Sequence, residues 1–238
     1  MFGQPSDWDA VDLGGAARWA PALPGHGGVP VDPRALSLEG IADALASAVV
    51  GRGWRRVAVA GYSLGGRVAL QLGLRHPGLV EALVLVSASA GIEDAEARRV
   101  RVELDRARAN ALRRDPAGFL LSWYSAPMFG YDSAGAEAAA RRRMGDGIDV
   151  EAAARVLEAL SPGVQPWVGD RLGDLPAPCC WVAGSRDTAY VVSTRSCADG
   201  SGARHVVVPR VGHAVHLDAP EAVSAVLRES VSAGIASP

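Results

Sequence analysis

The stretch Arg56–Gly66 reads RVAVAGYSLGG and decides the fold. Its first five residues have the length of a strand, and the pattern Gly-x-Ser-x-Gly follows directly, with Ser63 at its centre and a helical stretch after it. In this context the serine hydroxyl is exposed at the carboxyl edge of a sheet, and Gly61 and Gly65 are expected where a Cβ atom would collide with backbone. The backbone N–H of Leu64 would face negative charge developing beside the serine. We therefore predict that Ser63 is the reactive group.

The order of groups in such a site predicts the partners of Ser63. An acid and then a histidine should follow the serine along the chain. Asp187 follows an apolar run at 179–183 and His213 follows another at 205–208. Both therefore come at the carboxyl end of a predicted strand, where open parallel sheets bind their ligands. We expect His213 to polarise Ser63 and Asp187 to orient His213.

Other histidines and carboxylates compete for these two roles. His216 lies three residues after His213, but it falls where the last helix approaches, so we favour His213 as the base. The other histidines fit structural positions at a strand start, a glycine-rich turn and a helix end: His205, His26 and His76. The competing acids fit turns, caps or the wrong end of a strand: Asp199, Asp218 and Asp174.

Alternating strand and helix patterns predict a parallel sheet with crossover helices. Four short apolar runs have the character of parallel strands covered on both faces, at 56–60, 82–86, 179–183 and 205–208. A fifth and weaker strand candidate is Arg18–Leu23. Helical stretches accompany the strands at 37–50, 66–75 and 220–233. The pattern predicts an α/β-hydrolase fold in a single domain spanning residues 1–238.

The strand pattern is interrupted between about residues 89 and 174. This segment is rich in alanine and arginine, and it shows helical periodicity without a convincing strand, at 95–114, 116–124, 134–143 and 150–160. We interpret it as a helical cap inserted between two strands of the sheet.

The composition of the 238 residues excludes several classes of function. All 24 basic residues are arginine, which excludes a Schiff base or a lysine base. The net charge of −2 gives no reason to expect a nucleic-acid or membrane partner. The cysteines and histidines lack metal-site spacing and no nucleotide-binding motif occurs, so we expect no metal and no organic cofactor. The cysteine usage and the absence of a signal-peptide pattern lead us to expect a cytoplasmic location.

Five local strings spread over nearly the whole chain carry a family resemblance: Leu23–Gly28 (LPGHGG), Gly61–Ala69 (GYSLGGRVA), Trp123-Tyr124 with Pro127, Gln165-Pro166, and Gly184 with Asp187. Together they resemble the 2-succinyl-6-hydroxy-2,4-cyclohexadiene-1-carboxylate synthases (SHCHC synthases, MenH). Many hydrolases share the first string and the serine pattern. Three features are more specific to this family: the arginine that follows Gly65 and Gly66, the tryptophan–tyrosine pair and the glutamine–proline pair.

The resemblance implies a reaction on a small polycarboxylate. Members of this family eliminate pyruvate from 2-succinyl-5-enolpyruvyl-6-hydroxy-3-cyclohexene-1-carboxylate in menaquinone biosynthesis. Ser63, polarised by His213, would then act as a base on a carbon acid instead of forming an acyl-enzyme. Two alternatives stay open: a serine hydrolase acting on a small ester, amide or thioester, and a non-catalytic binding protein with a hydrolase-like fold.

A polycarboxylate needs fixed cations, and the planar fork of arginine pairs two carboxylate oxygens at once. The resemblance implies as substrate-binding residues Arg67, Arg101, Arg143, Tyr62 and Trp123. Arg98 is an alternative to Arg101, one turn away on the same helix face, and Arg142 is an alternative to Arg143. On spacing alone, the cap arginines fit a solvated helix face equally well, and Trp123 fits a core position.

One departure from the family concerns the second donor to the developing oxyanion. In hydrolases of this kind an apolar strand ends in His-Gly, and the next residue supplies that backbone N–H. This sequence starts with Met1-Phe2-Gly3, where the strand should just have ended. We therefore expect N-terminal strands to be missing and the true product to begin upstream. In the chain as given, the N–H of Met1 or Phe2 would replace the lost donor only in part.

Overall fold

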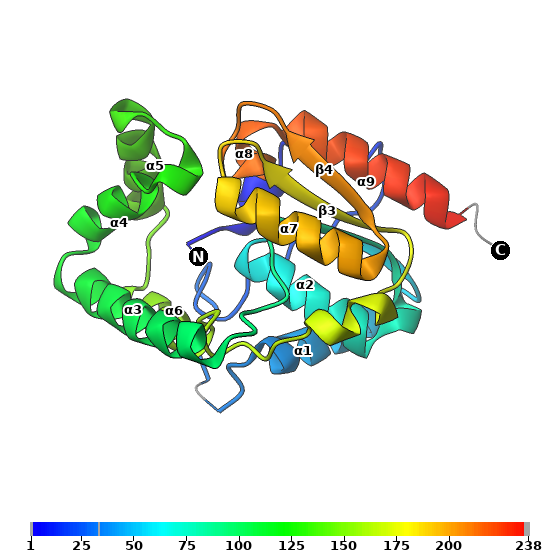
Figure 1. Ribbon diagram of the computed structural model, residues 1–238, viewed down its shortest axis with the longest axis horizontal. Coiled ribbons are helices and arrows are strands. Elements are labelled where there is room, and N and C mark those ends of the chain that lie inside the picture. The colour runs from blue at the N-terminus through cyan, green and yellow to red at the C-terminus, as the bar shows by residue number, and fades with distance from the viewer. Residues whose placement is uncertain (1, 33, 236–238) are drawn as a thin grey trace.

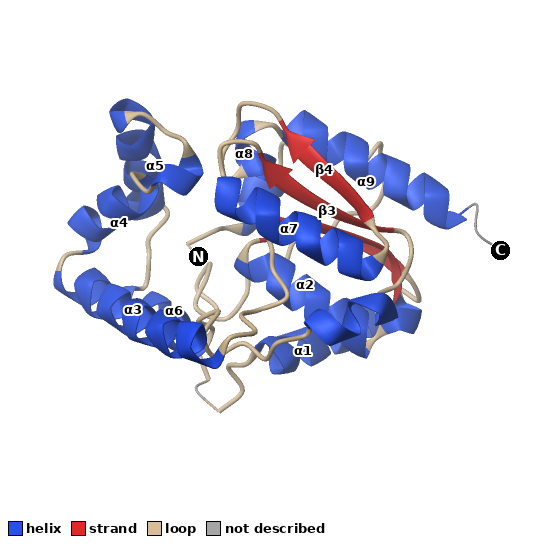
Figure 2. Ribbon diagram, viewed as in Figure 1, coloured by secondary structure: helices blue, strands red, loops and turns tan. Residues whose placement is uncertain are grey.

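A sheet of four parallel strands forms the centre of the molecule (Figures 1 and 2). The computed structural model of the chain describes residues 2–32 and 34–235. The strands lie side by side in chain order: β1 (Val57–Tyr62), β2 (Val80–Val86), β3 (Cys179–Gly184) and β4 (Arg204–Val208). The four main predicted strands and the parallel sheet are thereby confirmed.

The fifth strand candidate, Arg18–Leu23, is wrong. The structure has an extended loop there, with no strand pairing. Pro21 and Pro24 lie in or directly after this stretch, and proline has no N–H to donate to a ladder. The apolar residues still pack on the body of the protein, since Trp19 contacts Trp54 with ring centroids 6.5 Å apart.

Helices cover both faces of the sheet. The side chains of β2 alternate, so that Leu83 and Leu85 belong to one buried cluster and Val84 and Val86 to another. The first cluster includes residues of α1 (Leu38–Gly51), α2 (Leu64–Arg75) and α7 (Thr188–Ser201). The second includes residues of α8 (Val215–Asp218) and α9 (Pro220–Ile235). The two central strands, β2 and β3, are buried on both faces, which explains why they read as continuous apolar runs.

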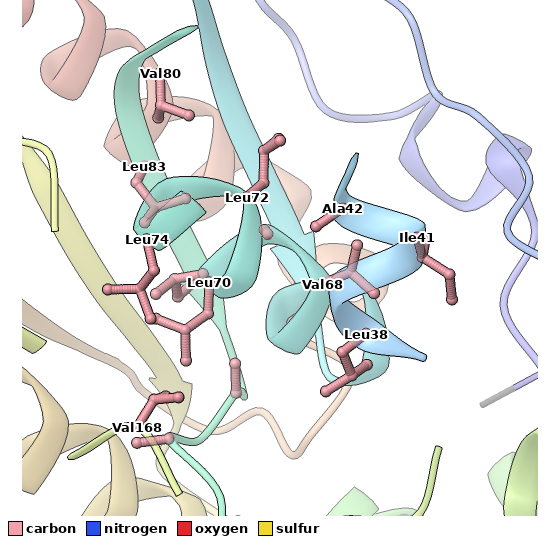
Figure 3. Close-up of a cluster of buried hydrophobic side chains, with 14 of the residues drawn as sticks. Leu38, Ile41, Ala42, Val68, Leu70, Leu72, Leu74, Val80, Leu83 and Val168 are labelled. Carbon is pink, nitrogen blue, oxygen red and sulfur yellow. The ribbon is translucent and has the colours of Figure 1, made fainter. Parts of the chain in front are cut away.

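The largest buried cluster of the described residues packs α2 between α1 and the strands β1 and β2 (Figure 3). Helix α1 contributes Leu38, Ile41 and Ala42, and α2, which is buried around its circumference, contributes Val68, Leu70, Leu72 and Leu74. Because α2 begins directly after Ser63, this packing also fixes the turn that carries the serine.

Four helices between β2 and β3 form a separate group, drawn in green at the left of Figure 1. They are α3 (Ala95–Arg114), α4 (Pro116–Tyr124), α5 (Ser133–Gly145) and α6 (Val150–Ala159). Each is capped at its N-terminus by an aspartate side chain that accepts a backbone N–H: Asp94, Asp115, Asp132 and Asp149. These helices share their own buried cluster, and Phe2 and Ala214 join it from outside the group. We call α3–α6 the cap helices.

Within residues 2–32 and 34–235, no helix combines the length and the apolar character needed to cross a membrane.

Candidate active site

Ser63 lies in the sharp turn between β1 and α2. Its backbone has φ 49° and ψ −109°, a conformation that is costly for a residue with a Cβ atom and persists only where its surroundings fix it. Two neighbours must be glycine, because a Cβ on Gly61 would collide with the Gly65 carbonyl and one on Gly66 would lie 2.6 Å from the Ala88 Cβ. The collision predicted for Gly65 is wrong, since nothing outside its own helix lies within 4 Å of a Cβ there.

The structure brings Ser63, His213 and Asp187 together in one hydrogen-bonded row. His213 Nε2 lies 3.0 Å from Ser63 Oγ, and His213 Nδ1 lies 2.6 Å from Asp187 Oδ2. An ionised carboxylate only accepts hydrogen bonds, so Asp187 favours the proton on Nδ1 and leaves Nε2 able to accept the serine proton. Asp187 and His213 are 1% and 2% exposed, and such burial strengthens their interaction relative to water.

Segments far apart in the chain hold this row in place. The backbone N–H of His213 donates to the Met128 carbonyl at 2.9 Å, and the His213 carbonyl accepts from Ser87 Oγ at 2.8 Å. Asp187 caps α7, because its Oδ1 accepts from the Tyr190 backbone N–H at 3.3 Å. The histidine is thus fixed from the end of β2 and from the segment that joins the cap helices α4 and α5.

Three aromatic rings surround the His213 imidazole. The ring centroids of Tyr190, Tyr62 and Phe129 lie 4.5, 5.2 and 5.8 Å from it. Burial lowers the pKa of His213, and the hydrogen bond to Asp187 offsets part of this effect. His213 is therefore neutral at pH 7, which is the form that can accept a proton.

The two predicted oxyanion donors lie at different kinds of position. Leu64 is buried at the first position of α2, where a backbone N–H has no acceptor within the helix. Phe2 has a positive φ of 57° and a buried ring that contacts Phe119 and Trp123, with centroids 6.0 and 5.5 Å apart. Met1, the other candidate donor, lies outside the described residues.

Arg67 lies one helical turn after Ser63 and is 6% exposed. Its Nη1 donates to Gln165 Oε1 at 3.2 Å and its Nη2 donates to the Leu160 carbonyl at 2.9 Å. None of the described residues places a carboxylate within ion-pair distance of this guanidinium, and burial lowers its pKa to about 10. Burying a charge without an opposite charge is costly, so this cation can accept an anionic partner from outside the protein.

Arg101 is held by a buried carboxylate on its own helix. Its Nε donates to Asp105 Oδ2 at 2.8 Å, while Arg108 binds the other oxygen at 2.8 Å and the Ser161 hydroxyl donates at 2.7 Å. The positive charge of Arg101 contributes to lowering the pKa of Arg67, so the two cations act on one another. Arg98 is half-buried and its side chain has no hydrogen-bond or ion-pair partner among the residues that the structure describes.

Arg143 is buried, and all three nitrogen atoms of its guanidinium group have partners within the protein. Its Nη2 lies 2.6 Å from Asp7 Oδ2, its Nη1 lies 3.0 Å from Asp146 Oδ2, and its Nε donates to the Tyr124 hydroxyl at 3.2 Å. Two carboxylates already compensate this cation. Arg142 is largely exposed and lies 3.6 Å from Asp7. The structure therefore presents Arg143 as a clamp between the N-terminal segment and the cap helices.

The two predicted aromatic residues occupy different surroundings. Tyr62 packs against both His213 and His216, with a centroid distance of 4.2 Å to the latter. Trp123 is half-buried against Phe2, and the Arg108 guanidinium lies 5.3 Å from its ring centre. Tyr62 is thus beside the row of Ser63, His213 and Asp187, whereas Trp123 belongs to the cluster of the cap helices.

The competing groups have other partners. His216 is buried between Trp8 and Tyr62, and its Nδ1 has no hydrogen-bond partner among the described residues. His205 Nε2 lies 2.9 Å from Thr194 Oγ1, and Asp218 accepts from the Tyr131 hydroxyl at 3.0 Å. None of these side chains is hydrogen-bonded to Ser63.

Sequence reasoning missed Tyr190, Asp105 and Asp7. The signal for Tyr190 is its place three residues after Asp187, in the first turn of a helix that this candidate acid caps. The signal for Asp105 is its spacing of four residues from Arg101 on one helix face. Asp7 has no local signal, because Arg143 is 136 residues away in the sequence.

Within residues 2–32 and 34–235, no group of three or more His, Cys, Asp or Glu side chains could hold a metal ion. The chemistry of the row of Ser63, His213 and Asp187 is that of proton transfer between a serine, a neutral imidazole and a carboxylate.

Comparison with known proteins identifies the family. Residues 2–226 match the model of the alpha/beta hydrolase family. The chain is 31% identical to the 2-succinyl-6-hydroxy-2,4-cyclohexadiene-1-carboxylate synthase of Serratia proteamaculans, over 96% of this chain and 89% of that protein. It is also 31% identical to the chloroplastic protein PHYLLO of Arabidopsis thaliana, over 96% of this chain but only 15% of that much longer protein.

Solved structures show the same fold. MenH from S. aureus superposes with a TM-score of 0.81 at 22% identity, covering 90% of this chain and 82% of that one. A thermophilic esterase from Thermogutta terrifontis superposes with a TM-score of 0.78 at 22% identity, covering 97% and 86%. At this level of identity the structures establish architecture alone, whereas the sequence relatives establish the family. The chain is an enzyme of the alpha/beta hydrolase family and belongs, within it, to the 2-succinyl-6-hydroxy-2,4-cyclohexadiene-1-carboxylate synthases.

Proposed function

We propose that this enzyme eliminates pyruvate from 2-succinyl-5-enolpyruvyl-6-hydroxy-3-cyclohexene-1-carboxylate, the reaction of menaquinone synthesis that gives 2-succinyl-6-hydroxy-2,4-cyclohexadiene-1-carboxylate. The observation that carries the proposal is Arg67, a buried guanidinium one turn from Ser63 with no carboxylate partner among the described residues. A hydrolase of neutral esters has no use for such a cation. A lyase acting on a tricarboxylate does, because the substrate supplies the missing negative charge.

The hydrogen-bonded row of Ser63, His213 and Asp187 supplies the base. His213 Nε2, 3.0 Å from Ser63 Oγ, accepts the hydroxyl proton, and the serine oxygen takes the proton from a ring carbon of the substrate. The electron pair of that C–H bond forms a new C=C bond, and the C–O bond to the enolpyruvyl group breaks. The leaving group departs as enolpyruvate and becomes pyruvate when its methylene carbon takes a proton, which His213 can return.

Asp187 and Leu64 support the charges that arise during this step. The Asp187 carboxylate, 2.6 Å from Nδ1, stabilises the imidazolium that forms on His213. The backbone N–H of Leu64 and the N-terminus of α2 favour negative charge beside Ser63. We assign Phe2 the weaker role of a second backbone donor.

The arginines hold the carboxylates of the substrate. Arg67 provides the buried cation beside the base, and Arg101 provides a second one that Asp105 keeps in a fixed direction. Arg98 has no polar partner among the described side chains, so it is available to a further carboxylate. Arg143 contributes more to docking the cap helices than to charge recognition, because Asp7 and Asp146 already bind it.

The test is to incubate the purified chain with the enolpyruvyl substrate and follow pyruvate through lactate dehydrogenase and the loss of NADH absorbance. A parallel reaction contains p-nitrophenyl acetate, a neutral ester that the serine hydrolase alternative predicts as a substrate. We expect pyruvate release with a kcat/KM that exceeds that for the ester by several orders of magnitude. Efficient ester hydrolysis without pyruvate release would overturn the proposal in favour of a hydrolase.

A further inference from the structure

Tyr190 lies against the candidate base and has no role in the reaction described so far. It occupies the first turn of α7, whose N-terminal end points toward α8 in Figure 1. Its ring packs edge-on against the His213 imidazole, with centroids 4.5 Å apart and planes at 67°. Since Asp187 accepts a hydrogen bond from the Tyr190 backbone, the position of the ring is tied to that of the acid.

The hydroxyl of Tyr190 makes no hydrogen bond with any of the described residues. Two other tyrosines show the contrast: the Tyr124 hydroxyl accepts from Arg143, and the Tyr131 hydroxyl donates to Asp218. Tyr190 is half-buried, but its hydroxyl is not one of the buried polar atoms that lack a partner, so the hydroxyl itself is accessible. A ligand can therefore reach it and accept a hydrogen bond from it.

The charges around the hydroxyl define which acceptor it favours. Burial raises the pKa of Tyr190, while the nearby positive charges of Arg67 and Arg101 act in the opposite direction without cancelling the rise. The hydroxyl is therefore protonated at neutral pH and can donate. An acceptor bound at this hydroxyl experiences the same two positive charges, so a negatively charged acceptor binds there more favourably than a neutral one.

We propose that the Tyr190 hydroxyl donates a hydrogen bond to a substrate carboxylate that Arg67 and Arg101 bind, and so completes a carboxylate subsite beside His213. In this subsite Arg67 provides one positive charge, and Arg101 provides a second whose side chain Asp105 orients. Tyr190 adds a neutral hydrogen-bond donor. The identity of the natural ligand rests on the proposed lyase function, but the subsite itself requires only a small carboxylate.

The experiment compares the wild-type chain with Tyr190→Phe, which keeps the ring on His213 and removes only the hydroxyl. Tyr131→Phe is the matched control, since it removes a tyrosine hydroxyl that donates to Asp218, the last residue of α8. Calorimetric titration uses 4-oxo-4-phenylbutanoate, a small keto acid with one carboxylate, and its neutral analogue 1-phenylbutan-1-one. Melting temperatures verify that each variant is folded, and KM and kcat for pyruvate release are measured in parallel.

We expect Tyr190→Phe to weaken binding of the keto acid roughly tenfold, as a lost hydrogen bond to a charged group does. KM for the enolpyruvyl substrate should rise by a similar factor, with a smaller change in kcat, and Tyr131→Phe should change neither. Equal affinity of wild type and Tyr190→Phe for the keto acid, including no binding by either, overturns the subsite. Weakened binding without any pyruvate release would support the subsite and refute the lyase, so the two claims fail separately.

Discussion

At the residue scale, the proposed proton transfer depends most on the 2.6 Å contact between His213 and Asp187. Asp187→Asn keeps the shape of the side chain, but its amide no longer favours the proton on Nδ1 and no longer stabilises an imidazolium. We expect kcat for pyruvate release to fall about 10³- to 10⁴-fold, as in other sites with this arrangement. A loss of less than tenfold in a variant with a native circular dichroism spectrum would contradict the role of Asp187.

The residues of this site differ in how far the sequence reveals them. Ser63, Asp187 and His213 can be predicted because each lies within five residues after an apolar run, so that strand ends locate them. The need for glycine at position 61 can be predicted for the same local reason, whereas the need for it at position 66 depends on Ala88, which the pattern does not contain. The role of Gly65 was misjudged because whether a Cβ collides depends on the packing around it, which the pattern alone does not contain.

At the element scale, Asp105 joins α3 to the loop after α6. Its buried carboxylate accepts from Arg101, Arg108 and Ser161 at once. Asp105→Asn leaves these donors with a neutral partner that can satisfy fewer of them. We expect the free energy of unfolding to fall by about 1–3 kcal/mol, measured by urea denaturation.

The same helix offers a matched control. Arg99 and Glu96 form an ion pair on the exposed side of α3, with side chains 70% and 62% exposed. Glu96→Gln removes a pair that water already screens, so we expect a change of no more than about 0.5 kcal/mol. Similar losses in both variants would show that Asp105 acts as an ordinary surface charge.

Elements with a local signal were predicted well. The four cap helices each begin directly after an aspartate that caps them, and the strands of the sheet read as apolar runs. The segment Arg18–Leu23 was misread because it has apolar residues that the core uses, as Trp19 shows. The prolines beside it keep the backbone from joining the sheet.

At the scale of the whole molecule, buried neutral histidines make stability depend on pH. His213 and His216 are about 2% and 1% exposed; burial lowers the pKa of His213 and lowers that of His216 to about 3. In the unfolded chain both titrate near 6.5, so below pH 6.5 the unfolded state binds more protons than the folded state, for His216 down to about pH 3. Stability should fall as the pH drops through this window, by up to about 1.4 kcal/mol per pH unit for each histidine.

His216→Phe tests this dependence. The variant keeps an aromatic ring between Trp8 and Tyr62 and removes one titrating group together with an unpaired buried nitrogen. We expect the slope of unfolding free energy against pH, measured with urea between pH 7 and pH 5, to be shallower than in the wild type. Identical slopes would mean that His216 does not contribute to acid sensitivity.

Contacts that join distant parts of the molecule could not be read from the sequence. The clamp between Asp7 and Arg143 spans 136 residues and depends on how the cap helices dock on the N-terminal segment. The influence of Arg67 and Arg101 on the pKa of Tyr190 depends on how three separate helices, α2, α3 and α7, are placed. The resemblance to a known family pointed to the arginines, but only the structure distinguishes the uncompensated Arg67 from the compensated Arg143.

The proposed elimination of pyruvate requires Ser63 to take the proton from the substrate carbon. The rate of pyruvate release by Ser63→Ala tests this requirement most directly. Ser196→Ala, an exposed serine on α7, is the control for the substitution itself. We predict a kcat about 10³-fold or more below the wild type for Ser63→Ala and an unchanged kcat for Ser196→Ala. Pyruvate release by Ser63→Ala within tenfold of the wild-type rate would contradict the proposed role of Ser63.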